Sequence, residues 1–108
     1  MAFTPYHNIT GSTGVTTELI KSGSNASGIK SIMIANTHSS NVATVTLFLQ
    51  DNPSNTAPST FSILSTTSIP ANVSLLLDNV PLLSFNNSTY GLYLTVGSSD
   101  TLDVLINN

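Results

Sequence analysis

The sequence contains no cysteine and no tryptophan, and charged side chains are scarce. The absence of cysteine excludes disulfide bonds, thiolate metal ligands and cysteine nucleophiles. Lys and Arg together number two and Asp and Glu five among 108 residues, which gives a formal net charge of −3. The two cations, Lys21 and Lys30, are too few for the clustered positive charge of a nucleic-acid surface or an electrostatic membrane anchor. We therefore expect no nucleic acid and no membrane as partners.

Long apolar runs are also missing, and none approaches the roughly 20 residues that span a bilayer. Residues 1–5 show neither the basic region nor the apolar stretch of a secretory signal. Without such a signal we expect the Asn-x-Ser/Thr sequences to be unglycosylated. They begin at Asn8, Asn25, Asn72, Asn86 and Asn87.

The polar half of the chain is instead made of hydroxyls and amides, because Ser, Thr and Asn supply 44 of the 108 residues. These side chains alternate with Val, Ile and Leu along much of the sequence. Val45, Leu47 and Leu49, for example, alternate with Thr44 and Thr46. A period of two residues is typical of a half-buried β-strand, whose polar face forms short neutral hydrogen bonds.

Runs of this kind follow one another at close spacing, and no 3.6-residue pattern is long enough to predict a helix. Seven or eight short strands with turn residues between them predict an all-β fold, a single antiparallel β-sandwich of jelly-roll or immunoglobulin-like type. The predicted strands cover residues 15–21, 29–36, 42–50, 60–64, 73–77, 90–96 and 102–106, with an irregular or edge segment at 82–85.

The sequence predicts two parts, an extended N-terminal arm at residues 1–14 and the sandwich at residues 15–108. Gly11-Ser12-Thr13-Gly14 has the composition of a flexible hinge. The arm carries two aromatic residues, Phe3 and Tyr6. It could dock on a neighbouring molecule, or it could pack on its own domain or stay disordered.

Several large apolar residues fall on the strand faces opposite the inward set. In a sandwich these faces should meet water, so the residues either lie under the arm or a loop or form a subunit interface. Together with the arm aromatics they make up the predicted interface. Its members are Phe3, Tyr6, Met33, Phe48, Leu76, Tyr93 and Leu105.

Catalytic and metal-binding patterns are weak. His7 and His38 would need a distant carboxylate to complete a zinc site, so both are interpreted as surface histidines. The serines show no Gly-x-Ser-x-Gly sequence. We therefore expect no enzymatic activity, no metal, no cofactor and no small-molecule substrate. The five acids match no calcium loop, and the opening of a turn explains three of them, Asp51, Asp78 and Asp100. The other two are Glu18 and Asp103.

Three stretches together resemble a known family. In the first, a strand ending in Ala35-Asn36-Thr37 runs into a Thr/Val strand at residues 43–51. In the second, Ile69-Pro70-Ala71 forms a turn before a Leu-rich strand. In the third, Asp100-Thr101-Leu102 opens the closing strand. Over residues 15–108 the chain resembles the small β-sandwich virion proteins of tailed bacteriophages, especially those of cyanobacterial and marine phages.

The resemblance implies a virion structural protein, and first of all a capsid decoration (cement) protein that binds and stabilises the outside of the shell. It transfers no catalytic residue. The implied partners are the major capsid protein and further copies of the chain, with a trimer as the first expectation. The implied location is the capsid surface, and the host cytoplasm during assembly.

Three alternatives remain open at this point. A neck, collar or tail accessory protein belongs to the same structural class. A carbohydrate-binding module would use Phe48 and Tyr93 to stack on sugar rings, although tryptophan is absent. Five scattered acids do not exclude a hydrolytic enzyme. This alternative comes last because no residue can be assigned a catalytic role.

Overall fold

The computed structural model describes residues 5–9, 16–23, 29–51, 59–78, 87, 89–98 and 101–107. This part of the chain contains strands and no helix, and the predicted all-β sandwich is confirmed. The strands are β1 (Tyr6–Ile9), β2 (Thr16–Ile20), β3 (Ser31–Asn36), β4 (Ala43–Gln50), β5 (Thr60–Ile69), β6 (Ser74–Leu77), β7 (Gly91–Ser98) and β8 (Leu102–Asn107).

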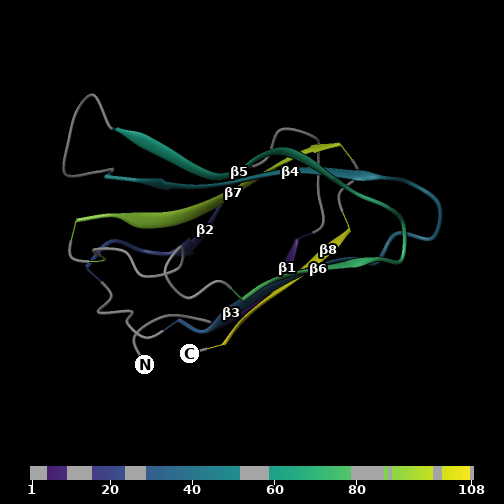
Figure 1. Cartoon of the computed structure of the whole chain (residues 1–108), viewed down its shortest axis with the longest axis horizontal. Helices are drawn as coiled ribbons and strands as arrows, with labels where there is room; N and C mark the ends of the chain where they lie inside the picture. Colours follow the sequence, from purple (N-terminus) through teal and green to yellow (C-terminus); the bar gives the residue numbers. More distant parts are fainter. Residues whose placement is uncertain are drawn as a thin grey trace.

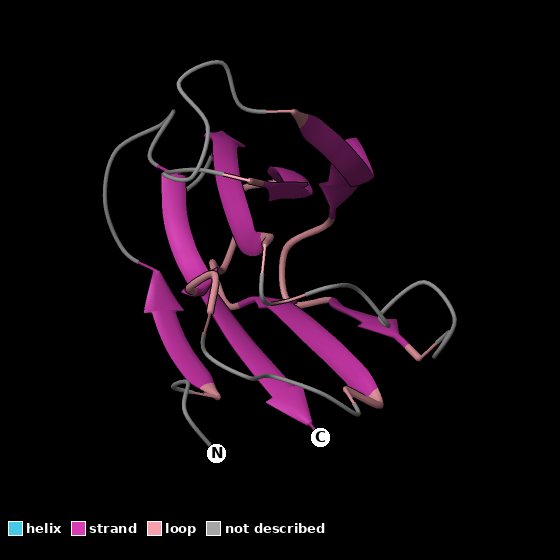
Figure 2. Cartoon of the chain, turned by 90° about the vertical axis from the view of Figure 1, so that its left-hand side faces the viewer, coloured by secondary structure: helices cyan, strands magenta, loops and turns pink. Residues whose placement is uncertain are grey.

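The strands form two four-stranded antiparallel sheets that face each other across the core (Figures 1 and 2). We call them sheet A, with the order β1-β8-β3-β6, and sheet B, with the order β2-β7-β4-β5. The pairs β1–β8, β2–β7, β3–β6 and β4–β5 are nested, like the two arms of one long hairpin. Rolling that hairpin up adds the contacts β3–β8 and β4–β7.

This order is that of an eight-stranded jelly roll. An immunoglobulin sandwich instead has the strand orders ABED and CFG, so that consecutive strands A–B and D–E are paired. Among the described strands, β4 and β5 form the one consecutive pair that is hydrogen-bonded. The structure thereby decides between the two sandwich types that the sequence left open.

Side-chain alternation accounts for the core. Along β3, burial alternates at every position, with Ile32, Ile34 and Asn36 inside and the residues between them half-buried outside. The buried cluster that the described residues form is entirely aliphatic, with side chains from both sheets. It contains Ile9, Leu19, Ile20, Ile29, Ile32, Ile34, Ala43, Val45, Leu47, Ile69, Leu92, Leu94, Val96, Leu102, Val104 and Ile106.

Strand β5 is longer than predicted and continues from Leu64 to Ile69. The four hydroxyl residues at 65–68 break the apolar alternation, which is why the sequence indicated an end at Leu64. The register against β4 shifts on both sides of Leu47, and Thr66 has a φ of 48°. Its N–H group donates to Thr46 Oγ1 at 3.0 Å. Bulges of this kind absorb extra residues and return Thr67 and Ile69 to positions opposite inward residues of β4.

The structure differs from the predicted arm at residues 6–9. These residues form β1, which pairs with β8 at the edge of sheet A, and Ile9 is buried in the core. They belong to the sandwich because Ile9 fills inner-face volume opposite Leu102. Residues 1–4 and 10–14 of the predicted arm, including Phe3 and the hinge, lie outside the described residues, as does the predicted segment 82–85.

Gly91 shows how closely β2 and β7 approach each other. The register shift between Glu18 and Ile20 leaves both Leu19 and Ile20 buried at the end of β2. A Cβ atom on Gly91 would lie 2.9 Å from the Ile20 carbonyl oxygen and 3.1 Å from Tyr93 Cε2. The backbone contact cannot yield by a side-chain rotation, so the position requires glycine.

We predict that Gly91→Ala lowers the free energy of unfolding by about 1–3 kcal/mol, the usual cost of an overpacked site. Gly97→Ala is the matched control on the same strand, because its Cβ would meet Thr44 O at an ordinary 3.4 Å. The control should be neutral or slightly stabilising. Denaturant unfolding of both variants measures the difference, and equal stabilities would contradict the packing argument.

Candidate interaction surface

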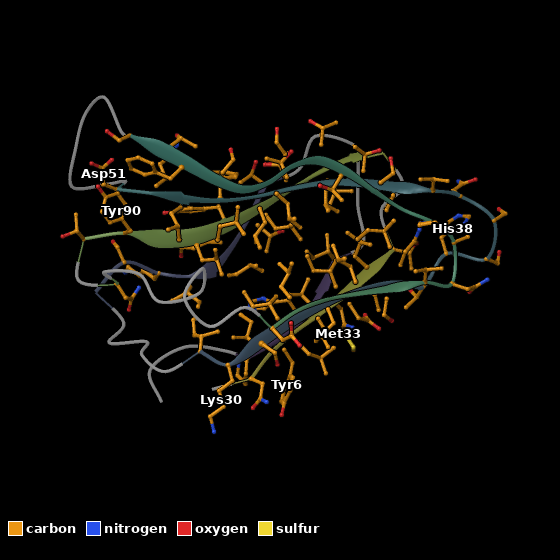
Figure 3. All side chains as sticks on the ribbon, viewed as in Figure 1. Tyr6, Lys30, Met33, His38, Asp51 and Tyr90 are labelled. Carbon is orange, nitrogen blue, oxygen red and sulfur yellow. The ribbon has the colours of Figure 1, made fainter. Side chains whose placement is uncertain are left out.

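The outer face of sheet A carries one continuous row of large apolar side chains. Tyr6 on β1 is paired with Leu105 on β8, Leu105 with Met33 on β3, and Met33 with Leu76 on β6. Directly paired residues place their side chains on the same face of a sheet. We call these four residues the sheet A row. Tyr6 and Met33 point away from the sandwich on the same side in Figure 3.

The sheet A row is exposed. Tyr6 is 68% accessible, Leu76 56% and Leu105 38%, while Met33 in the middle is half-buried. The row crosses all four strands, so these residues form one surface rather than scattered apolar positions. Apolar surface of this kind is unusual on a monomer and is typical of a contact site.

Small or polar residues border the sheet A row on both flanks. The first flank, which contains Asp103, is tied across two strands because Asn8 Nδ2 donates to Asp103 Oδ1 at 2.6 Å. The second flank contains Ser31 and Asn107. An apolar centre with a polar rim is the usual anatomy of a protein–protein interface. The complete first flank consists of Asn8, Asp103, Ala35 and Ser74.

The outer face of sheet B is different. Phe48 and Tyr93 are neighbours there and stack on each other, with ring centroids 5.6 Å apart and an interplanar angle of 19°. Tyr93 is only 7% accessible, and its hydroxyl donates to Glu18 Oε2 at 3.3 Å. Burial, and secondarily the charge and hydrogen bond of Glu18, raise the pKa of Tyr93. The two rings therefore stabilise the sheet rather than present an open aromatic platform.

Threonines cover the neighbouring part of sheet B. The hydroxyls of Thr16 and Thr95 lie 2.8 Å apart across β2 and β7, and Thr95 is paired in turn with Thr46 on β4. Neutral hydroxyls satisfy one another here without ionic groups. This face is consequently polar but nearly uncharged.

We predict that Tyr93 ionises above its ordinary pKa of 10.0. Because the folded pKa is raised, its contribution to stability is complete below the unfolded pKa and is lost as the pH rises through the folded pKa. Difference absorbance against Tyr93→Phe reports the titration. In the Glu18→Gln variant the pKa of Tyr93 should fall only part of the way toward 10.0, because the burial of Tyr93 remains. Ionisation of Tyr93 at or below the ordinary value would contradict this assignment.

Asn36 is a buried polar residue that holds one end of the sandwich together. Its Nδ2 donates to the carbonyl oxygens of Asn41 at 2.8 Å and Ile69 at 2.9 Å, and its Oδ1 accepts the His38 N–H at 3.1 Å. The side chain thus ties the β3–β4 connection to the end of β5. The burial of Asn36 was not predicted from the sequence. The alternation along the strand nevertheless places Asn36 on the same inward face as Ile32 and Ile34.

We predict that Asn36→Ala lowers the free energy of unfolding by about 2–4 kcal/mol, because it leaves buried carbonyl and N–H groups unsatisfied. Asn41→Ala is the control, since the Asn41 side chain is exposed and Asn36 binds its backbone. That change should stay within about 0.5 kcal/mol. Thermal or denaturant unfolding distinguishes the two variants. If Asn36→Ala lowered the free energy of unfolding no more than Asn41→Ala, the hydrogen bonds of the Asn36 side chain would not be needed for stability.

The polar residues considered for chemistry have structural contacts instead. His38 Nδ1 accepts N–H bonds from Ser40 at 3.1 Å and Asn41 at 3.0 Å, which closes the turn after β3. Asp51 Oδ1 accepts the Ser59 N–H at 2.7 Å and so joins the two ends of the β4–β5 connection. Within the described ranges, His, Cys, Asp and Glu form no group of three that could hold a metal ion. The described residues also include no helix able to cross a membrane.

The structure divides the predicted interface between two faces. Tyr6, Met33, Leu76 and Leu105 come together on sheet A, whereas Phe48 and Tyr93 stack on sheet B. Alternation correctly indicated which side chains point outward but contained no information on sheet membership. Sequence reasoning also missed Phe61, which is 54% exposed. Its ring contacts that of Tyr90 edge to face, with the ring centroids 5.8 Å apart.

Comparison of the chain with protein-family models, with curated proteins and with solved structures found no match in any of the three.

Proposed function

We propose that the chain is a structural protein of a tailed-bacteriophage particle, and specifically a capsid decoration protein that binds the outside of the shell and stabilises it. The major capsid protein and neighbouring copies of the chain are its partners. The observation that carries the proposal is the sheet A row, an exposed apolar strip with a polar rim on a protein that has few charged side chains. The sequence resemblance supplies the viral setting.

The jelly-roll topology supports this function without establishing it. Viral capsid proteins share the topology with lectins and cupins, so the fold alone does not select one of them. The surface chemistry favours adhesion. Interfaces made of apolar contacts and neutral hydrogen bonds depend little on salt, because few ion pairs are available to be screened. A protein held on a particle by such contacts stays attached when ionic strength changes.

A neck, collar or tail accessory protein would use the same surface, and it is the alternative within the same class of virion structural proteins. The carbohydrate-binding alternative fits less well. Sugar stacking needs an exposed ring face, and the two aromatics assigned to it, Phe48 and Tyr93, cover each other. The chemistry of the site therefore supports protein contacts over sugar stacking.

The proposal is tested by quantitative mass spectrometry and imaging of purified particles. The chain should be present in many copies, and a labelled chain should lie over the shell rather than at the neck or tail. Absence from intact particles would remove the proposal. A signal confined to the neck or tail would replace decoration by the accessory role.

The sheet A row itself is tested by a double change, Leu76→Ser with Leu105→Ser. We predict that occupancy of particles at limiting protein concentration falls about tenfold or more, since each tenfold step corresponds to about 1.4 kcal/mol. The matched control is Val42→Ser with Val73→Ser, which alters two aliphatics of 49% and 44% exposure outside the row. Equal occupancy of both double variants would show that the row is not a contact surface.

A further inference from the structure

We propose that the sheet A row packs against the same row of a second copy of the chain, in a two-fold pair whose axis runs along the row, across the strands. The inference rests on the proposed function, because it names the partner of the face described there. It depends on how the charges flank the row.

Lys30 and Asp103 lie on opposite flanks of the row. Asp103 is paired with Ala35, two residues beyond Met33, and so lies about 7 Å from the row at the usual strand rise. Lys30 precedes β3, three residues before Met33, or about 10 Å from the row on the other flank. The Lys30 N–H still donates to Asn107 O at 2.7 Å, which keeps this residue beside β8. Figure 3 shows the Lys30 side chain on the outer side of the sheet with Tyr6 and Met33.

An axis along the row exchanges the two flanks. Lys30 of one copy then faces Asp103 of the other, and the contact occurs twice. Asp103 Oδ1 accepts a hydrogen bond from Asn8 Nδ2, which ties this carboxylate to its neighbour on β1. Opposite charges at the rim fix orientation and register, while the apolar centre supplies most of the affinity.

A second face-to-face two-fold pair has its axis along the strands. That arrangement keeps each flank opposite itself, so Lys30 meets Lys30 and Asp103 meets Asp103 at about one strand spacing, roughly 4.8 Å within the plane. Like charges so placed are repulsive. Among the described residues, Asp78 is a further charged residue beside this face, and it follows Leu76 by two positions on the Lys30 flank. In the favoured arrangement it faces Ser74 of the second copy and meets no like charge.

The first test is sedimentation of the full chain over a concentration series. The proposal expects a monomer–dimer equilibrium, and Leu76→Ser should raise the dissociation constant at least tenfold. Asp103→Lys and Lys30→Asp should each weaken the dimer, and the two changes together should restore it. Glu18→Lys, an equal charge change on sheet B, should leave it unaltered. A chain that stays monomeric up to about 1 mM, where binding is worth only about 4 kcal/mol, overturns the proposal.

The second test places the axis and uses the natural absence of cysteine. Facing sheets lie about 10 Å apart, too far for a disulfide but within reach of a short bismaleimide. With the axis along the row, Leu76→Cys meets its own copy and should cross-link, whereas Ser74→Cys, about 7 Å off the row, should not. With the axis along the strands, the two copies of Leu76→Cys lie about 14 Å apart in the plane and stay unlinked. That result would overturn the geometry.

The two proposals fail separately. A chain found on particles but monomeric at every concentration overturns the pairing and leaves the decoration role. A chain that dimerises through the sheet A row but is absent from particles removes the decoration role and leaves the pairing.

Discussion

The structure depends on burying aliphatic side chains between two sheets, and the core cluster that the described residues form is made of aliphatic side chains alone. Each strand contributes to that layer through every second residue, and the residues between are committed to the outer faces. Ile34 and Val104, paired on β3 and β8, are both completely buried. Their neighbours Met33 and Leu105 are therefore forced outward as a pair. The contact surface on sheet A is a direct consequence of the register that builds the core.

Neutral polar side chains supply the hydrogen bonds that hold connections and strand ends of the sandwich in place. Asn36 closes one end of the sandwich, and Asn87 acts similarly elsewhere, donating to the carbonyls of Lys21 at 3.1 Å and Tyr90 at 3.0 Å. Each buried amide satisfies several backbone groups at once, which a charged side chain could do only with a larger desolvation penalty. A chain with few charges can therefore be fully hydrogen-bonded, and its surface remains suited to close packing against other proteins.

Sequence reasoning located most strands because their alternation is strong. The segments around Val45 and Val104 were predicted nearly to their observed ends. It failed where the period is interrupted. The hydroxyl run after Leu64 hides a bulged continuation of β5, and Tyr6–Ile9 is too short and irregular to show a period of two. The buried role of Asn36 was not predicted, although its alternation with Ile32 and Ile34 placed it on the inward face.

The amino-acid sequence by itself determined the class of fold, the aliphatic residues that form the core and the near absence of ionisable chemistry, because these follow from local period and composition. Only the tertiary structure decided which strands share a sheet. In a jelly roll nearly every hydrogen-bonded pair joins segments distant in the chain, and alternation carries no record of the partner strand. That pairing gathered Tyr6, Leu105, Met33 and Leu76 into one row and sent Phe48 and Tyr93 to the opposite face.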